Sequence, residues 1–167
     1  MDQQTTVLGE TLRGRMEREK ELFLEMGQQV ERLRDSVQRK SWTAGLALAQ
    51  GLEQFALTIE EADTERDKAF CALCASLGLP ADAVFSAVLA RMPAGQRTTL
   101  EESWRNLRMS VVRLATATNR LRYFAEALAG TLGRILEEVF PHRRGKIYSR
   151  RGKATSVNDS LLVDRSL

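Results

Sequence analysis

The residues of this chain that could do chemistry are few, and the first pair is Cys71 and Cys74. A Cys-x-x-Cys motif supports redox chemistry in a strand–helix setting, or zinc binding when two further ligands are present. Neither setting is available, because the flanking residues have helical spacing and the chain has only 2 cysteines. Cys74 lies in line with Phe70 and Leu77, so we predict a small buried apolar side chain.

The single histidine, His142, follows Pro141 at the edge of a basic segment. Acid–base or nucleophilic catalysis needs a base beside a nucleophile, and no such pair can be built around this residue. The glycines are scattered along helical stretches rather than clustered in a phosphate-binding loop, and no Glu-x-x-His pair offers a metal site. We therefore predict a protein that is not an enzyme and needs no cofactor, metal or small-molecule substrate.

The third candidate is a basic tail, residues 142–167, which holds seven Lys or Arg against two Asp. The preceding 141 residues carry a net charge of −2, so the positive charge is concentrated at the end of the chain. Such a tail could contact nucleic-acid phosphates, but Tyr148 is its one aromatic residue, and base stacking needs several. Nucleic-acid binding is thus a disfavoured alternative function. A helical scaffold that self-associates through its apolar stripes is another.

Apolar residues at helical spacing account for the rest of the chain, and no strand signal is present. Steps of three and four residues predict a first helix over about residues 4–39, with one position skipped near residue 19. Ser41 is expected to cap a second helix, which Gly78 and Pro80 end. The stripe of this second helix comprises Trp42, Leu46, Ala49, Leu52, Phe55, Ile59, Ala62, Arg66, Ala69, Leu73 and Leu77.

A short helix is expected over residues 81–92, before a break at Pro93-Ala94-Gly95. Val84, Val88 and Met92 are expected to lie on one side of it. Thr98 and Thr99 are each followed three residues later by Glu, which predicts a doubled capping box at the start of a last helix of about 40 residues. The first half of its stripe comprises Leu100, Trp104, Leu107, Val111, Leu114, Thr118 and Leu121.

Long helices joined by short breaks pack best as antiparallel neighbours. We therefore expect an all-α fold, an elongated antiparallel bundle of three long helices plus a short connecting helix over residues 1–141. Residues 142–167 are expected to form a flexible, largely disordered basic tail. No stretch reaches the roughly 20 apolar residues of a bilayer crossing and no secretory signal is present, so a cytoplasmic protein without a transmembrane segment is predicted.

The last part of the final helix is apolar on two sides, and it contains several small residues: Ala127, Ala129, Gly130 and Gly133. Two interpretations are open. The apolar residues could pack inside the bundle, or they could form a groove that takes an amphipathic helix from a partner. An exposed apolar stripe of this size would ordinarily mark an interaction site.

The layout of the C-terminal third resembles the FlgN family, the cytoplasmic export chaperones of bacterial flagellar hook-associated proteins. The final helix carries Asn119 about four turns before its apolar end, and Tyr148 followed by Gly152 comes after the Pro break. Asp67-Lys68 on the second helix resembles the family's charged pair, which is usually Glu-Lys. A second family asparagine is replaced here by Thr116.

The resemblance implies a bacterial cytoplasmic chaperone for type III export. Family members bind the terminal amphipathic segments of hook–filament junction proteins and deliver them to the export gate. The implied partners are therefore flagellar hook-associated proteins and the cytoplasmic domain of the gate, which Tyr148 and Gly152 would contact. The implied cargo-binding residues are Phe124, Leu128, Leu132, Ile135 and Val139.

Overall fold

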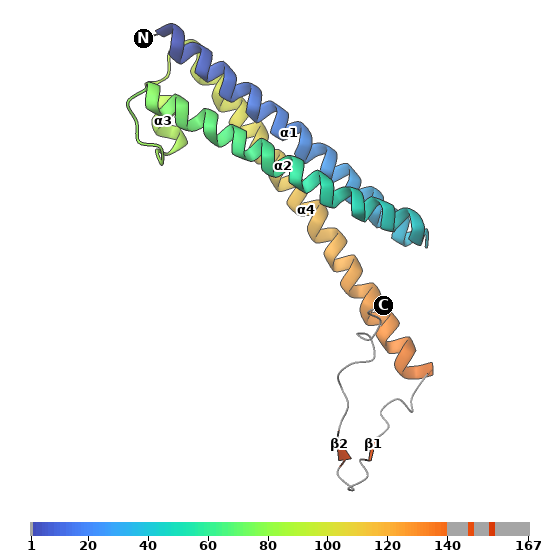
Figure 1. Cartoon of the computed structure of the whole chain (residues 1–167). Coiled ribbons are helices and arrows are strands. Elements are labelled where there is room, and N and C mark those ends of the chain that lie inside the picture. Colours follow the sequence, from blue (N-terminus) through green and yellow to red (C-terminus); the bar gives the residue numbers. More distant parts are fainter. Residues whose placement is uncertain (1, 140–146, 149–153, 156–167) are drawn as a thin grey trace. The chain divides into compact units, whose positions relative to one another are not determined.

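The computed structural model describes residues 2–139 and, in the tail, residues 147–148 and 154–155. Its helices are α1 (Asp2–Gln38), α2 (Trp42–Ser76), α3 (Phe85–Arg91) and α4 (Ala94–Val139), as Figure 1 shows. The all-α prediction, with three long helices and a short connecting one, is confirmed. The chain divides into two compact units, an N-terminal unit of residues 1–123 and a C-terminal unit of residues 124–167, and the boundary falls inside α4.

The tail contains two short strands that the sequence did not predict. Strand β1 (Ile147–Tyr148) pairs antiparallel with β2 (Ala154–Thr155), with Ile147 opposite Thr155 and Tyr148 opposite Ala154. The remaining tail residues, His142 and Gly152 among them, lie outside the described residues. The predicted boundary at residue 141 and the predicted disorder of the tail stay predictions.

Helices α1 and α2 form an antiparallel hairpin in which the two helices lie side by side (Figure 1). Ion pairing of Arg15 with Glu65 links the two helices along their length. Between the two helices the chain turns at Lys40, which adopts a φ of 59°, and the Ser41 amide donates to the Ser36 carbonyl over 2.9 Å. Ser41 therefore stands at the predicted cap position, but its hydroxyl makes no capping hydrogen bond.

The end of α2 is the predicted glycine turn. Gly78 has a φ of 64°, in the left-handed region that glycine adopts without a steric cost. The amide of Leu79 donates to the Cys74 carbonyl over 2.8 Å, and the guanidinium of Arg91 donates to the Leu77 carbonyl over 2.8 Å. These bonds tie the end of α3 back to the end of α2.

Two sequence predictions about α3 and α4 are wrong. Val84 precedes α3 and is 67 % exposed, so it does not share a side with the buried Val88 and Met92. The predicted capping box at Thr98 and Thr99 does not form, because α4 already begins at Ala94. The Pro93 carbonyl accepts the amides of residues 96 and 97, which starts the helix directly after the proline. The Thr99 hydroxyl then donates to the Gln96 carbonyl over 3.0 Å, a bond within the helix.

All the helices meet in one core within the N-terminal unit. The largest inward side chains are Leu12 and Met16 from α1, Leu73 and Cys74 from α2, Val88 and Met92 at α3, and Leu100 and Leu107 from α4. Their burial places the core where the N-terminal half of α1 meets the end of α2. The rings of Phe85 and Trp104 stack beside this core with centroids 4.7 Å apart, so α3 is held against α4.

Helix α4 faces the bundle with most of the predicted residues, since Leu100 and Leu107 are buried and Leu114 and Leu121 are half-buried, but two positions differ. Val111 and Thr118 are exposed, whereas Ser103, Ser110 and Ala117 are buried. The Ser110 hydroxyl is satisfied within the helix, because it donates to the Leu107 carbonyl over 2.7 Å. The bundle side of α4 therefore includes small side chains that the apolar spacing did not mark.

Two contacts set the direction of α4 relative to α1 within the N-terminal unit. The Gln96 side-chain amide donates to the Thr6 carbonyl over 3.2 Å, and Arg120 lies 3.9 Å from the Glu31 carboxylate. Because both pairs advance together along the sequence, α4 runs parallel to α1. It is therefore antiparallel to α2, as expected for the third long helix of the bundle.

Two glycine substitutions test this description of the turns. Gly78→Ala should lower the free energy of unfolding by about 1–2 kcal/mol, since an L-residue is strained at positive φ. Gly51→Ala, inside α2, should raise it by up to about 1 kcal/mol, because a Cβ there meets no atom within 4 Å and alanine favours the helix. Urea unfolding followed by circular dichroism measures both free energies. If both substitutions changed the free energy of unfolding in the same direction, this description of the two glycine positions would be contradicted.

Candidate functional site

The apolar residues predicted to bind cargo lie on one face of α4. This terminal face comprises Phe124, Leu128, Leu132, Ile135 and Val139, whose steps of three and four residues keep them in line along a helix. The same face carries Leu107, Leu114 and Leu121 at seven-residue intervals before Leu128. It is therefore the direct continuation of the face by which α4 packs in the core.

Burial decreases along this continuous face. Leu107 is 2 % exposed, whereas Leu132 is 49 % and Val139 is 61 % exposed. Phe124 and Leu128 are half-buried, and every residue from 131 to 139 is exposed. Within the C-terminal unit, the described helix therefore presents Leu132, Ile135 and Val139 as exposed apolar side chains. Exposed apolar surface is unfavourable in water by about 25 cal/mol per Å². Large exposed patches of this kind mark interaction sites.

The other residues tied to the FlgN resemblance occupy varied settings. Tyr148 lies in β1, and Gly152 lies outside the described residues. On α4, Asn119 is exposed, and the Thr116 hydroxyl donates to the Val112 carbonyl over 2.8 Å. Asp67 accepts a hydrogen bond from Arg66, so one half of the predicted charged pair is engaged within α2.

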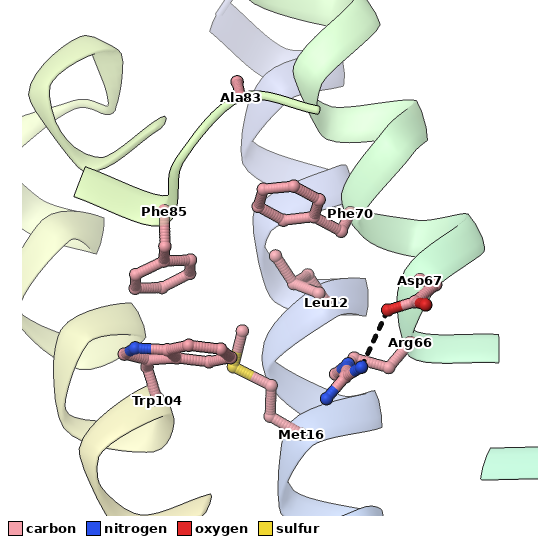
Figure 2. A pocket seen from close by; sticks show the side chains of 8 residues that line it. All are labelled: Leu12, Met16, Arg66, Asp67, Phe70, Ala83, Phe85 and Trp104. Atoms are coloured by element: carbon pink, nitrogen blue, oxygen red, sulfur yellow. Dashed lines mark hydrogen bonds and ion pairs between the residues drawn. The ribbon is translucent and has the colours of Figure 1, made fainter. Parts of the chain in front are cut away.

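A hollow of about 240 Å³ lies beside the core of the N-terminal unit. Figure 2 shows the flat rings of Phe85 and Trp104 on one side of it, Phe70 and Leu12 on the other, and the Arg66–Asp67 ion pair at its edge. Its walls are mainly apolar and aromatic side chains.

Next to this hollow, one buried carboxylate faces a shared guanidinium. Glu19 of α1 is 1 % exposed, and the Nη1 atom of Arg66 donates to its Oε1 atom over 3.4 Å. The Nη2 atom of Arg66 is closer to Asp67, at 2.7 Å, and also bonds Asp63. The Oε2 atom of Glu19 is buried without a hydrogen-bond partner among the described residues.

This arrangement raises the pKa of Glu19. Burial is the main cause, and the charge of Arg66 opposes it without outweighing it. Burial also acts to lower the pKa of Arg66, but the hydrogen bond to Asp67 and the neighbouring carboxylates raise it overall. The two directions agree physically, because Arg66 is shared among three carboxylates and Glu19 receives its weakest contact.

The sequence contained a signal for this pair. Position 19 is the skipped place in the stripe of the first helix, and Arg66 occupies a position in the stripe of the second. Charged residues at two inward-facing positions of adjacent antiparallel helices indicate a buried ion pair.

The cysteine prediction is confirmed for Cys74, which is fully buried in the core, and burial raises the pKa of its thiol. Cys71 is exposed and free. Within the described ranges, no group of three or more His, Cys, Asp or Glu side chains is arranged to hold a metal ion.

None of the described helices combines the length and the apolar character that a bilayer crossing requires. Comparison of the chain with protein-family models, with curated proteins and with solved structures found no match.

Replacing the buried carboxylate tests the shared-guanidinium description. A raised pKa in the folded state means that burying Glu19 costs nothing extra below its ordinary value of 4.5, where the group is protonated whether folded or not. The cost then grows as the pH rises through the raised value. Glu19→Gln should therefore gain stability relative to wild type as the pH rises above 4.5. Urea unfolding at each pH measures the difference in free energy of unfolding between the variant and wild type. If the advantage of the variant shrank with rising pH, the raised pKa of Glu19 would be contradicted.

Two leucines on the same face of α4 test whether the terminal face is part of the core. Leu107→Ala should lower the free energy of unfolding by about 2–5 kcal/mol, because it leaves a cavity. Leu132→Ala should change it by no more than about 0.5 kcal/mol, as for an exposed position. Equal losses in urea unfolding would show that the terminal face is covered in the free protein.

Proposed function

We propose that this chain is a bacterial cytoplasmic export chaperone. It holds the C-terminal amphipathic segment of a flagellar hook-associated protein and delivers that protein to the type III export gate. One observation supports the proposal above all others. The core-facing side of α4 continues in phase from Leu107 to Val139, yet its last part is exposed.

A partner helix is the natural ligand for such a face. The partner helix would carry anchor side chains at intervals of three, four and seven residues. These anchors would fit between Leu128, Leu132 and Ile135, as in other complexes where a helix packs in a groove. No charge lies within the terminal face itself, so the contact is apolar and should tolerate salt.

A chaperone of this kind protects its cargo by covering an apolar stripe. The free cargo segment would otherwise expose that stripe and aggregate. Binding orders a flexible segment, and the entropy lost offsets part of the energy of burial, so affinity should be moderate for the area covered. Moderate affinity suits a protein that must release its cargo at the gate.

The finer assignments come from the FlgN resemblance. They include hook–filament junction proteins as the cargo and Tyr148 with Gly152 as the residues that dock on the gate. The features that support them are Asn119 before the apolar end of α4 and the Asp67-Lys68 pair on α2. Roles divided between a helix and a tail would let the chain hold one partner while it engages a second.

Charge placed in the terminal face tests the cargo site. Leu128→Asp and Leu132→Asp should each weaken binding of the C-terminal helical segment of a hook-associated protein at least ~100-fold, because a carboxylate would be buried without a partner. Val112→Asp is the matched control, since Val112 is an exposed apolar residue on the opposite side of α4. Isothermal titration at two salt concentrations measures all three.

Tyr148→Ala should leave cargo binding unchanged and impair only docking on the gate's cytoplasmic domain. Loss of cargo binding in this variant would contradict the division of roles. Absence of cargo binding in the wild type would contradict the chaperone proposal itself. Binding to nucleic acid through the tail, or a salt-resistant dimer dispersed by Leu132→Asp, would then support the scaffold or nucleic-acid alternative.

A further inference from the structure

We propose that two copies of this chain associate through a second interface, separate from the terminal face. In this contact the outer face of α2 from one copy seats on a hollow between α1 and α4 of the other. The proposal goes beyond the chaperone function, and every residue that carries it belongs to the N-terminal unit.

The receiving surface is a hollow of about 520 Å³ between α1 and α4. Its apolar lining comes from Phe23 and Leu24 of α1 and from Leu114 and Ala117 of α4. Gly27 also lines the hollow, and a Cβ at that position would meet no atom within 4 Å, so the space beside it is open. The space is large enough for apolar side chains from an approaching helix.

The rim of this hollow is positive. Arg32 and Arg113 line it, and neither has a carboxylate within 4.0 Å among the described residues. Glu31 also lines the hollow, but its charge is met by Arg34 at 2.7 Å and by Arg120 at 3.9 Å. A ligand would therefore encounter unpaired guanidinium groups around an apolar floor.

The positive charge extends along α4. Between Glu102 and Glu126 this helix has no acidic residue. The same stretch contains five arginines: Arg105, Arg108, Arg113, Arg120 and Arg122. Guanidinium groups bind carboxylates in a fixed, two-pronged geometry, so a partner with acidic side chains beside its apolar ones fits this surface.

Helix α2 of the same chain has that chemistry on its outer face. Three large apolar side chains are exposed there, Trp42 at 58 %, Leu46 at 62 % and Leu57 at 54 %. Helical spacing places them in one line with Glu53 and Glu60.

The acidic side chains of this outer face are available for a partner. Among the described residues, Glu53, Glu60 and Glu61 form no ion pair within 4.0 Å, unlike Glu65, Asp63 and Asp67 further along α2. No basic residue occurs on α2 before Arg66. The outer face is thus an acidic amphipathic helix surface with no cover in a single copy.

One contact between copies accounts for both exposed surfaces. It would cover the apolar side chains of α2 and fill the hollow, while carboxylates of α2 meet the arginines of α4. Exposed apolar patches of this kind are otherwise a liability for a soluble monomer. If each copy supplies both surfaces to the other, the assembly closes as a twofold dimer.

Sedimentation equilibrium of the full chain tests the proposal. Reversible self-association is expected, and it should weaken as ionic strength rises, because charge pairs contribute. Arg113→Glu and Glu60→Arg should each weaken it at least tenfold. Mixing these two variants should restore association, since the reversed charges again match. That rescue could not come from variants that had merely lost their fold.

Filling the hollow gives a second, uncharged test. Gly27→Leu should weaken association at least tenfold, whereas Gly14→Leu should leave it unchanged. Gly14 is the matched control, because it lies on α1 outside the hollow and its Cβ position is equally open. Leu132→Asp should also leave association unchanged, which separates this interface from the cargo site.

Three results would overturn the proposal. The first is a chain that stays monomeric at the highest soluble concentration. The second is association that is unaffected by Arg113→Glu and Gly27→Leu. The third is association abolished by Leu132→Asp, which would assign self-contact to the terminal face instead. None of them depends on whether a hook-associated protein binds, so the chaperone proposal is judged separately.

Discussion

The apolar face of α4 is longer than the helix that packs beside it. Arg120 contacts Glu31, and α1 ends seven residues later at Gln38. Helix α4 continues for another 19 residues to Val139 and keeps its leucines and isoleucine at seven-residue spacing. The apolar spacing of α4 thus extends for 19 residues beyond its contact with α1 at Arg120. The excess is the feature on which the functional proposal depends.

The alignment of α1 with α2 is fixed by one buried ion pair, so the place where α1 ends is fixed as well. Glu19 and Arg66 face each other between these helices, inside an otherwise apolar seam. A slip of one helical turn would set each charge against apolar side chains, at a cost of several kcal/mol per unpaired ion. The pair contributes little net stability, because Glu19 is incompletely satisfied, but it favours one alignment over its neighbours.

That alignment positions the short elements that close the core. With α1 and α2 in register, the end of α2 lies where Arg91 can bond the Leu77 carbonyl. Val88 and Met92 then complete the core, and Phe85 stacks on Trp104 of α4. The N-terminal unit is thus packed at the end near α3, and the apolar surface of α4 becomes steadily more exposed away from it.

The sequence predicted the helices well because their signals are local. Apolar spacing and the Gly78 turn are properties of neighbouring residues, and both were found where expected. The facing of α4 was predicted less well, since Ser103 and Ser110 resemble surface residues yet are buried. Small polar side chains are accepted inside a bundle when they bond their own helix and allow close approach, which depends on the neighbouring helix.

The candidate site also depends on features that the local sequence does not contain. The sequence placed Phe124, Leu128, Leu132, Ile135 and Val139 on one stripe, but periodicity cannot tell a buried stripe from an exposed one. That distinction depends on the lengths and the register of other helices. The outer face of α2 was misassigned for the same reason, because Trp42 and Leu46 were expected to face inward and are exposed.

Hydrogen–deuterium exchange along α4 tests the central claim most directly, measured with and without the C-terminal helical segment of a hook-associated protein. In the free chain, residues 124–139 should exchange much faster than residues 100–117, because no packed neighbour stabilises them. Adding the segment should slow exchange in residues 124–139 and leave residues 100–117 unchanged. Equal protection of both regions in the free chain, or no slowing on addition, would contradict an uncovered face that receives a partner helix.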